Sequence, residues 1–176
     1  MAIRILGIDP SLASTGYAFR STKGDDEGMT VVGHMKGDKM RGVGRLVILE
    51  RRLLDLLDTV KPRIVVFEGY AMGVRSGMHR AFDLGELGGV FKKAIWERGI
   101  DLLLVPPAVL KKHATGNGAI KKDKMVSYLK RKSGLDFATS DEADAYALLR
   151  LGELHYNEGR HVEGVQEVKG RPIRVK

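Results

Sequence analysis

Three short strand-like segments follow one another at the start of the chain, and this run constrains the fold more than any other feature. Residues 3–9 form a mainly apolar run that contains β-branched side chains and ends before Pro10. Residues 16–21 and 29–35 also have strand-like patterns, and a polar, Gly-bounded turn separates them. Strands that are joined this tightly pair antiparallel. The sequence therefore predicts an antiparallel meander of three strands.

The following part of the chain alternates between helices and strands. Apolar residues have helical spacing over 41–60 and again over 80–98, and a short apolar strand follows each helix, at 63–68 and at 101–105. Further helical segments are expected at residues 106–113, 121–132 and 140–158. Crossovers of this kind return the chain to the same sheet. We expect an α/β fold with a mixed five-stranded sheet and helices on both faces.

One domain is expected over residues 1–158, because no repeat, low-complexity tract or internal boundary interrupts this order. The polar segment 159–176 is expected to be a basic C-terminal tail, either flexible or acting as an arm.

The sequence has no cysteine, which excludes disulfides, thiol nucleophiles and cysteine-bound zinc. It has neither a signal-peptide layout nor an apolar run of the roughly 18 residues that a membrane span needs. We therefore expect a cytoplasmic protein.

The charge balance favours a polyanionic partner. Lys and Arg number 30 against 22 Asp and Glu, which gives a formal net charge of +8. Basic side chains that neutralise phosphates release condensed counterions, and this release drives binding to nucleic acids. Many basic proteins never contact nucleic acid, so the charge alone does not identify the partner.

Two acids lie at the ends of apolar strands. Asp9 closes the first strand, and Glu68 closes the strand at 63–68. Each needs a cation or a hydrogen-bond donor, because an unpaired buried charge is costly. If the two strands are neighbours, both carboxylates emerge at the same edge of the sheet.

Two further acids lie at the start of the last helix. Asp141 and Asp144 are three residues apart, so they share one helical face. Thr139-Ser-Asp-Glu142 resembles a capping box, which predicts that the helix begins there. If this helix packs on the sheet, its first turn can point toward Asp9 and Glu68.

Four converging carboxylates without His or Cys partners suit Mg²⁺ or Mn²⁺ rather than zinc. Two such ions about 3.5–4 Å apart can activate water and stabilise the leaving oxygen in phosphodiester hydrolysis. Taken singly, each acid also has an ordinary explanation as a turn-former or a helix cap. The combination is less easily explained in that way, because two separate strands and one helix all supply acids.

The sequence also resembles the RuvC-type Holliday junction resolvases, which belong to the RNase H-like superfamily. The resemblance is carried by ILGIDPSLASTGYA at 5–18, VVFEGY at 65–70, PPAVLKKHATGNGAIKKDKM at 106–125 and SDEADAYALL at 140–149. It implies a homodimer in which each subunit nicks one strand of a four-way DNA junction. It also implies that the metal-binding catalytic acids, holding two Mg²⁺ or Mn²⁺ ions, are Asp9, Glu68, Asp141 and Asp144.

Two positions depart from the family pattern. Ser11 stands where the family usually has Gly, and Asp144 stands where some relatives have His. These departures favour a divergent, phage-type member.

Basic residues for DNA binding are expected around the turn at 115–119. Lys111, Lys112, Lys121 and Lys122 flank this turn. The resemblance places Lys111 and Lys122 at positions that contact backbone phosphate near the acids. Independently of the resemblance, a phosphate that is drawn toward carboxylates needs flanking cations.

The loop at 69–79 and the helix after it offer further DNA and dimer contacts. Tyr70, Arg75 and Arg80 could stack on a base or bind phosphate, although an ordinary surface loop is equally compatible with these residues. Ala81, Gly85 and Gly89 recur every four residues on helix 80–98, where each Gly costs about 1 kcal/mol relative to Ala. The resemblance places a dimer interface here, and close packing on the protein's own sheet is the alternative.

Three other functions remain to be weighed. A non-catalytic binder of branched DNA would not need four intact acids, and a cleavage assay in Mg²⁺ separates it from a nuclease. A nuclease acting on flaps or other branched DNA would share the same acids. An ATP-binding protein of the sugar-kinase and actin type can begin with a similar strand and turn, but it needs a second such half, which 176 residues do not provide.

Overall fold

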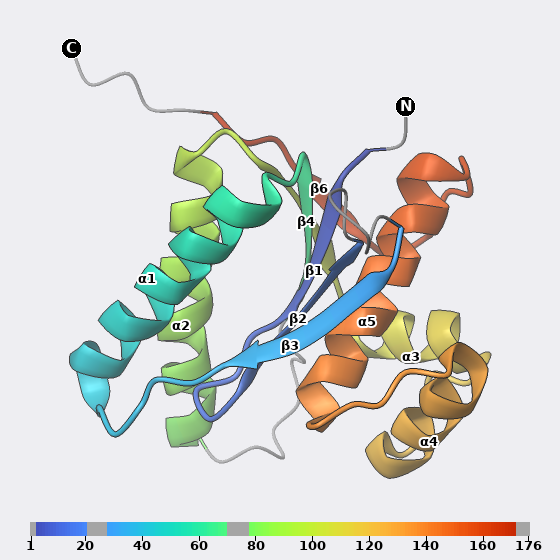
Figure 1. Ribbon diagram of the computed structural model, residues 1–176, viewed down its shortest axis with the longest axis horizontal. Coiled ribbons are helices and arrows are strands. Elements are labelled where there is room, and N and C mark those ends of the chain that lie inside the picture. Colours follow the sequence, from blue (N-terminus) through green and yellow to red (C-terminus); the bar gives the residue numbers. More distant parts are fainter. Residues whose placement is uncertain (1–2, 21–27, 70–77, 172–176) are drawn as a thin grey trace.

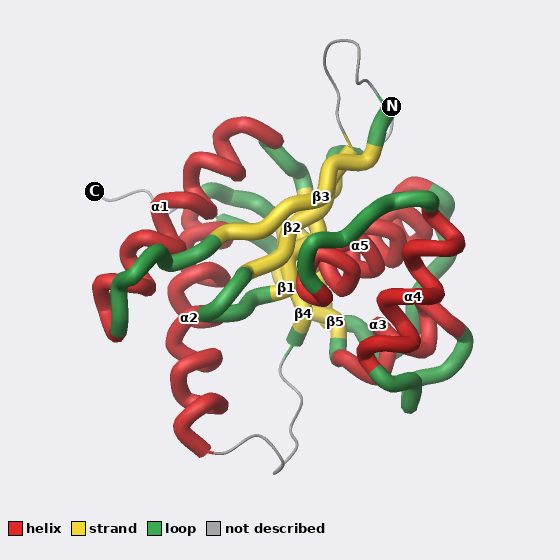
Figure 2. Tube along the Cα trace, turned by 60° about the horizontal axis from the view of Figure 1, so that its bottom comes forward, coloured by secondary structure: helices red, strands yellow, loops and turns green. Residues whose placement is uncertain are grey.

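A six-stranded mixed sheet lies between two layers of helices (Figures 1 and 2). The computed structural model describes residues 3–20, 28–69 and 78–171, except for the side chains of residues 78–81. The elements in chain order are β1 (Ile5–Asp9), β2 (Thr15–Arg20), β3 (Thr30–Met35), α1 (Gly42–Val60), β4 (Ile64–Glu68), α2 (Met78–Glu97), β5 (Asp101–Val105), α3 (Pro107–Thr115), α4 (Lys122–Ser133), α5 (Ser140–Gly152), the π-helical turn η2 (Glu153–Asn157) and β6 (Gln166–Val168).

The strand order is β3-β2-β1-β4-β5-β6. The first three strands pair antiparallel, which confirms the predicted meander. β4 pairs parallel with β1 and β5 pairs parallel with β4, so each of these strands returns to the sheet after a helix. The parallel order brings the C-terminal ends of β1 and β4 to one edge of the sheet.

The prediction of five strands was wrong, because a sixth strand lies in the segment expected to be a tail. β6 pairs antiparallel with β5, with Val168 opposite Leu102. The His155 ring of η2 joins this segment to the end of the last helix. Its Nδ1 accepts the Val162 N–H at 3.1 Å, and its Nε2 lies 3.2 Å from Glu167 Oε1. The strand has three residues and two of its side chains are exposed, so it lacks the apolar alternation that identifies a strand in a sequence.

Alternate residues of the central strands point into two separate cores. Leu6 and Ile8 of β1 face α1 and α2, whereas Ile5 belongs to the core under α3, α4 and α5. By the same alternation, Gly7 and Asp9 lie on the α5 side of the sheet. In the described part of the chain, no helix is long and apolar enough to cross a membrane.

Two glycines let α5 lie directly on the sheet. A Cβ atom at Gly7 would come within 2.2 Å of the Ala145 carbonyl oxygen, and one at Gly16 within 2.0 Å of the Asp141 carbonyl oxygen. Any side chain at either position would push the helix away from β1 and β2. The glycines therefore set how closely the first turns of α5 approach the end of β1.

Candidate active site

The acids at the strand ends are neighbours across the sheet. The register pairs Ile8 of β1 with Phe67 of β4, so the next residues, Asp9 and Glu68, lie side by side where the two strands end. Both have the strand parity that faces α5. Asp9 is 4% exposed, whereas Glu68 is partly exposed.

The helix that carries the other two acids begins where the sequence predicted. The Thr139 hydroxyl accepts the backbone N–H of Glu142 at 3.2 Å, which is half of a capping box. Glu142 does not complete the box. Its Oε2 accepts the backbone N–H of Ala138 at 2.6 Å, and its Oε1 lies 2.6 Å from Nδ1 of His34 on β3. The first turn of α5 is therefore held by its own cap and by the contact between Glu142 and His34 of the sheet.

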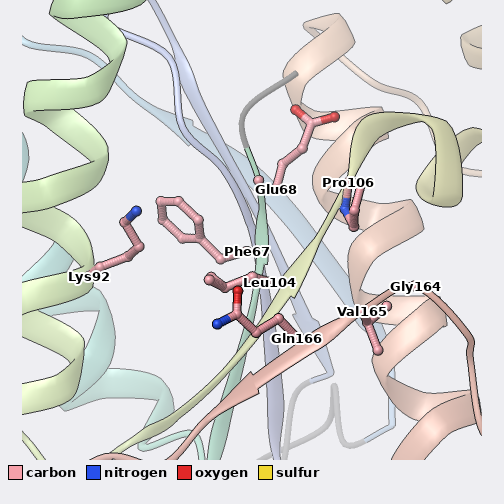
Figure 3. Close-up of a pocket in the computed structure, with 9 residues that line it drawn as sticks. Phe67, Glu68, Lys92, Leu104, Pro106, Gly164, Val165 and Gln166 are labelled. Atoms are coloured by element: carbon pink, nitrogen blue, oxygen red, sulfur yellow. The ribbon is translucent and has the colours of Figure 1, made fainter. Parts of the chain in front are cut away.

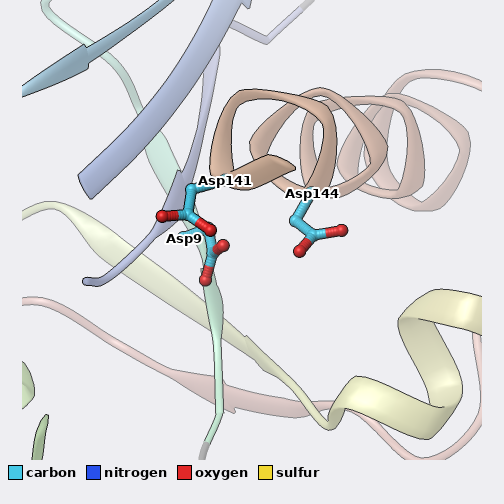
Figure 4. Close-up of side chains that lie close together, drawn as sticks. All are labelled: Asp9, Asp141 and Asp144. Atoms are coloured by element: carbon cyan, nitrogen blue, oxygen red, sulfur yellow. The ribbon is translucent and has the colours of Figure 1, made fainter. Parts of the chain in front are cut away.

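Three of the four acids converge. Asp9, Asp141 and Asp144 each offer a carboxylate oxygen, and these oxygens all lie within 4.8 Å of one another. Figure 4 shows Asp141 and Asp144 projecting from the start of α5 toward the strand end that carries Asp9. Glu68 interacts with Asp9 through both charge and a hydrogen bond. The four carboxylates therefore form one connected group, built from two strands and one helix.

Burial and like charge disfavour ionisation of the strand-end acids. The pKa of Asp9 lies well above its usual value because of burial, then the Glu68 charge and hydrogen bond, with a smaller effect from Asp144. Burial also raises the pKa of Glu68, although the hydrogen bond to Asp9 opposes that rise.

The helix-borne acids hold a lysine between them. Lys122 Nζ lies 2.9 Å from Asp141 Oδ1 and 2.9 Å from Asp144 Oδ2. Burial raises the pKa of Asp144, and the Lys122 ammonium opposes this rise. Burial disfavours the charge on Lys122, but Asp144 and Asp141 outweigh it and raise its pKa. The charge of Lys111 also lowers the pKa of Glu68 and Asp144, which places it near the acids.

The other expected DNA contacts stand apart from this group. Lys112 and Lys121 are exposed, and neither contacts the acids in the described part of the chain. Tyr70, Arg75 and the side chain of Arg80 lie outside the described residues.

A cleft of about 640 Å³ opens over the acids. Asp9, Glu68, Asp141 and Lys122 line it together with the turn at residues 10–13. Three further residues of its wall have no signal in the sequence, namely Arg45 of α1 and Asp83 and Leu84 of α2. No spacing signal could have identified them, because these helices reach the cleft only through the tertiary fold.

A second cleft, of about 610 Å³, lies on the other side of β4 (Figure 3). Phe67, Leu104 and Val165 make it largely apolar, with Lys92 and Gln166 at its walls. In Figure 3 the Glu68 carboxylate points away from Phe67, as strand alternation requires. The acid group is therefore directed toward the first cleft, although Glu68 borders both.

The glycines of α2 have open space beside them. A Cβ atom at Gly85 or Gly89 would meet nothing within 4 Å among the described residues, apart from its own helix and neighbours. Close packing on the protein's own sheet therefore does not explain either glycine in the part of the chain that the structure describes.

The donor set fits a hard divalent cation. All the converging groups are carboxylates, and neither His nor Cys belongs to the cluster found among the described residues. Mg²⁺ and Mn²⁺ prefer such oxygen ligands. A divalent cation would also favour the ionised forms of Asp9 and Glu68, whose pKa values are raised by burial and then by neighbouring negative charge.

Comparisons with known proteins agree with this architecture. A crossover junction endodeoxyribonuclease RuvC from Synechococcus sp. (strain WH7803) is 30% identical over 153 residues, which cover 85% of this chain and 97% of that relative. The RuvC of Neorickettsia sennetsu (strain ATCC VR-367 / Miyayama) is 26% identical over 157 residues, covering 86% of this chain and 91% of the relative. These relatives do not test the expectation of a phage-type member, which stays a prediction.

Solved structures show the same fold. T. thermophilus RuvC in complex with Holliday junction substrate superimposes with a TM-score of 0.72 at 21% sequence identity, over 94% of this chain and 99% of that chain. A second Thermus thermophilus RuvC structure gives a TM-score of 0.63 at 18% identity, over 94% and 100% of the two chains. The α/β fold is therefore RNase H-like, as the sequence predicted, with six strands in place of five. The family profile described as crossover junction endodeoxyribonuclease RuvC matches residues 5–149, and the chain belongs to the RuvC family.

Proposed function

We propose that this protein is a divalent-metal-dependent endodeoxyribonuclease that nicks four-way DNA junctions, with Asp9, Glu68, Asp141 and Asp144 as its metal-binding catalytic acids. One observation carries the proposal: carboxylate oxygens of three of these acids lie within 4.8 Å of one another, beside Glu68. Membership of the RuvC family supports the choice of substrate, since the relatives named above are crossover junction endodeoxyribonucleases.

The acids would hold two Mg²⁺ or Mn²⁺ ions. Bound there, the ions would supply Lewis-acid chemistry, which activates the attacking water and stabilises the leaving oxygen. Asp9 and Glu68 are suited to fix the ligand positions, because both lie at the ends of paired strands. Asp141 and Asp144 complete the set from a helix that is pressed against the sheet.

Lys111 and Lys122 would draw the scissile phosphodiester toward this negative site. Lys122 lies 2.9 Å from two of the acids, and the charge of Lys111 acts on Glu68 and Asp144. Cations in these positions offset the repulsion between a DNA phosphate and the carboxylates. Lys112 and Lys121 are exposed nearby and would contact the DNA backbone farther from the cleavage point.

The active form would be a homodimer built through α2. Gly89 has open space beside it in the described part of the chain, and Gly85 has room for a Cβ atom. A second copy of α2 could approach closely along this face, and a two-fold axis would present two active sites to a symmetric junction. Sedimentation of the wild type and of Gly89→Leu would test this arrangement, with loss of the dimer expected for the variant.

The nuclease is tested with a labelled four-way junction, a flap and a duplex, each incubated with the protein with and without Mg²⁺. We expect nicking of the junction in Mg²⁺ and none in EDTA. Asp9→Asn and Asp144→Asn should each slow nicking by about 1,000-fold, because several kcal/mol of transition-state stabilisation are lost. Both variants should still bind the junction.

Asp136→Asn is the matched control, because Asp136 is exposed and pairs with Lys130 away from the acid group. Its cleavage rate should equal that of the wild type. Normal cutting by Asp9→Asn or Asp144→Asn in Mg²⁺ would overturn the assignment of these acids. A wild type that binds junctions without cutting any of the three substrates would instead be a structural binder.

A further inference from the structure

We propose that Arg45 forms a second phosphate-binding position in the active-site cleft, contributed by the face of the sheet opposite Lys122. The inference rests on the proposed function, because it assigns the DNA strand a contact on both walls of the cleft. Its ligand is a backbone phosphate of the strand held over the acids, at a different place from the phosphate that is cut.

Arg45 and Lys122 reach the same cleft from opposite layers of the protein. α1 and α4 cover different faces of the sheet (Figure 1), yet the cleft over the acids is lined by both side chains. Asp9, Glu68 and Asp141 line the same cleft. A DNA strand that enters it therefore has carboxylates along its path and a cation on each side.

The Arg45 side chain is held in place before any ligand binds. Its Nε donates to the Met40 carbonyl at 2.9 Å. Its stem lies against Gly37, where a Cβ atom would come within 2.3 Å of Arg45 Cγ. Arg45 is partly buried, so little conformational entropy remains to be lost when it binds a ligand.

Among the described residues, no partner is seen for the outer nitrogens of Arg45. Within the described residues, its polar contact is the Met40 carbonyl, whereas Arg52, Arg98 and Arg150 each pair with an acid. Asp83 lines the cleft as well, but it is exposed and forms no ion pair with Arg45 in the described part of the chain. The two Nη groups therefore keep their planar donor fork, which matches the geometry of a phosphate.

A phosphate explains these features better than a base edge does. A base contact needs an arginine that reaches into a groove, whereas Arg45 is held at the wall of a cleft whose floor is acidic. A DNA backbone that crosses such a floor is repelled unless cations flank it. Lys111 and Lys122 supply positive charge on one side, and Arg45 supplies it on the other.

The test compares Arg45→Gln and Arg45→Lys with the wild type and with Arg51→Gln. Arg51 is exposed on the same helix and does not line the cleft, so it is a matched control. The dissociation constant of a labelled four-way junction is measured in Ca²⁺ at several salt concentrations, and nicking is measured in Mg²⁺.

Arg45→Gln should weaken junction binding about tenfold and reduce the slope of log K against log salt by about one, on junctions of any sequence. Arg45→Lys should lie between it and the wild type, because it keeps the charge but loses the planar fork. Arg51→Gln should match the wild type.

Three results would overturn the inference: Arg45 variants with the wild-type affinity and salt slope, an equal loss in Arg51→Gln, or a loss confined to one DNA sequence. The last result would indicate a base contact. The proposed function fails on a different observation, namely a wild type that does not nick any junction in Mg²⁺. A changed salt slope for Arg45→Gln can be seen in that case too, so the two failures are distinguishable.

Discussion

The two acids at the strand ends and the two acids on α5 face the same repulsion, but they differ in what offsets it. Lys122 bridges Asp141 and Asp144 at 2.9 Å, whereas no ion pair joins Asp9 or Glu68 to a cation among the described residues, and the Glu68 charge adds to the repulsion on Asp9. Lys122 does lower the pKa of both strand-end acids, but burial outweighs that effect. The strand pair is therefore the half of the site that most needs an added cation.

The two pairs also differ in how they are positioned. Asp9 and Glu68 are fixed by the register of paired strands, which the backbone hydrogen bonds of the sheet maintain. Asp141 and Asp144 depend on how α5 docks, and α5 docks where Gly7 and Gly16 leave room for its backbone. A change that displaces α5 should therefore separate Asp141 and Asp144 from Asp9 and Glu68 more easily than any change within the sheet.

The largest effect is expected from Gly16→Ala. The added Cβ atom would lie 2.0 Å from the Asp141 carbonyl oxygen and 2.8 Å from the Glu142 nitrogen, both of them backbone atoms that cannot rotate away. We expect the free energy of unfolding to fall by about 3 kcal/mol, at the upper end of typical overpacking costs. Nicking should be lost as well, because α5 must move away from β1. Urea unfolding and the junction assay measure the two effects.

Gly44→Ala is the control for this prediction. Its Cβ atom would meet the flexible end of Met40, which can move, and Gly44 lies within α1. The free energy of unfolding should stay the same or rise by up to about 1 kcal/mol, because Ala favours a helix over Gly. Equal stability of Gly16→Ala and the wild type would mean that docking of α5 does not depend on this contact.

The elements of the fold were largely readable from local pattern. Apolar spacing predicted α1, α2 and the five longer strands, because these elements bury a face with the period of their own geometry. β6 was missed because backbone pairing and the His155 ring hold it, rather than buried side chains. The last helix was expected to run to residue 158, but its regular part ends at Gly152 and a π-helical turn follows.

The acids were predictable and their surroundings were not. Strand-end and capping-box patterns predicted that Asp9, Glu68, Asp141 and Asp144 lie at the ends of two strands and the start of a helix, since each belongs to a local motif. Arg45 and the His34–Glu142 pair depend on contacts between distant segments, about which a single sequence carries no information. The close packing of α5 on the sheet did leave a signal in the sequence. A glycine inside an apolar strand, such as Gly7, often marks a place where another backbone approaches closely.

Asp9→Asn should stabilise the protein in EDTA by roughly 1–3 kcal/mol at pH values above the folded pKa of Asp9, because there it removes a buried charge. Burial and Glu68 raise the folded pKa of Asp9 above its unfolded value of about 3.8. Between these two values the folded state binds more protons, so wild-type stability falls as pH rises through that window. The advantage of the variant should therefore be full above the folded pKa and disappear below the unfolded one.

Thermal unfolding of both proteins between pH 3 and pH 8 measures this difference. Asp136→Asn serves again as control, because its carboxylate is exposed and paired with Lys130. A stability difference for Asp9→Asn that does not change with pH would contradict the view that the strand pair is destabilised by charge.

Lys122→Gln tests the helix-borne half of the site. The Lys122 ammonium lies beside Asp141 and Asp144, so it competes with a divalent cation for the same oxygens. Without it, we expect Mn²⁺ to bind the DNA-free protein about tenfold more tightly, a change of about 1.4 kcal/mol. Nicking should nevertheless slow, because the phosphate loses its cation. Calorimetry with Mn²⁺ and the junction assay should thus move in opposite directions.

Lys124→Gln, on the same helix and exposed, should leave Mn²⁺ affinity unchanged. Weaker Mn²⁺ binding by Lys122→Gln would mean that this lysine supports the metal site instead of competing with the metal. The helix-borne acids would then depend on Lys122 to bind the metal, as the strand-end acids do not.

The smallest effect is expected from Thr139→Ala, which removes the cap of α5. The Thr139 hydroxyl accepts the Glu142 N–H at 3.2 Å, and losing such a cap costs about 1 kcal/mol. Thr139→Ser should restore the lost stability in urea unfolding, because it keeps the hydroxyl. The nicking rate should change little, since the Glu142 carboxylate also binds His34 and the Ala138 N–H. A large loss of nicking at nearly normal stability would show that the cap, and not the contact between Glu142 and His34 of β3, holds Asp141 and Asp144 against the strand pair.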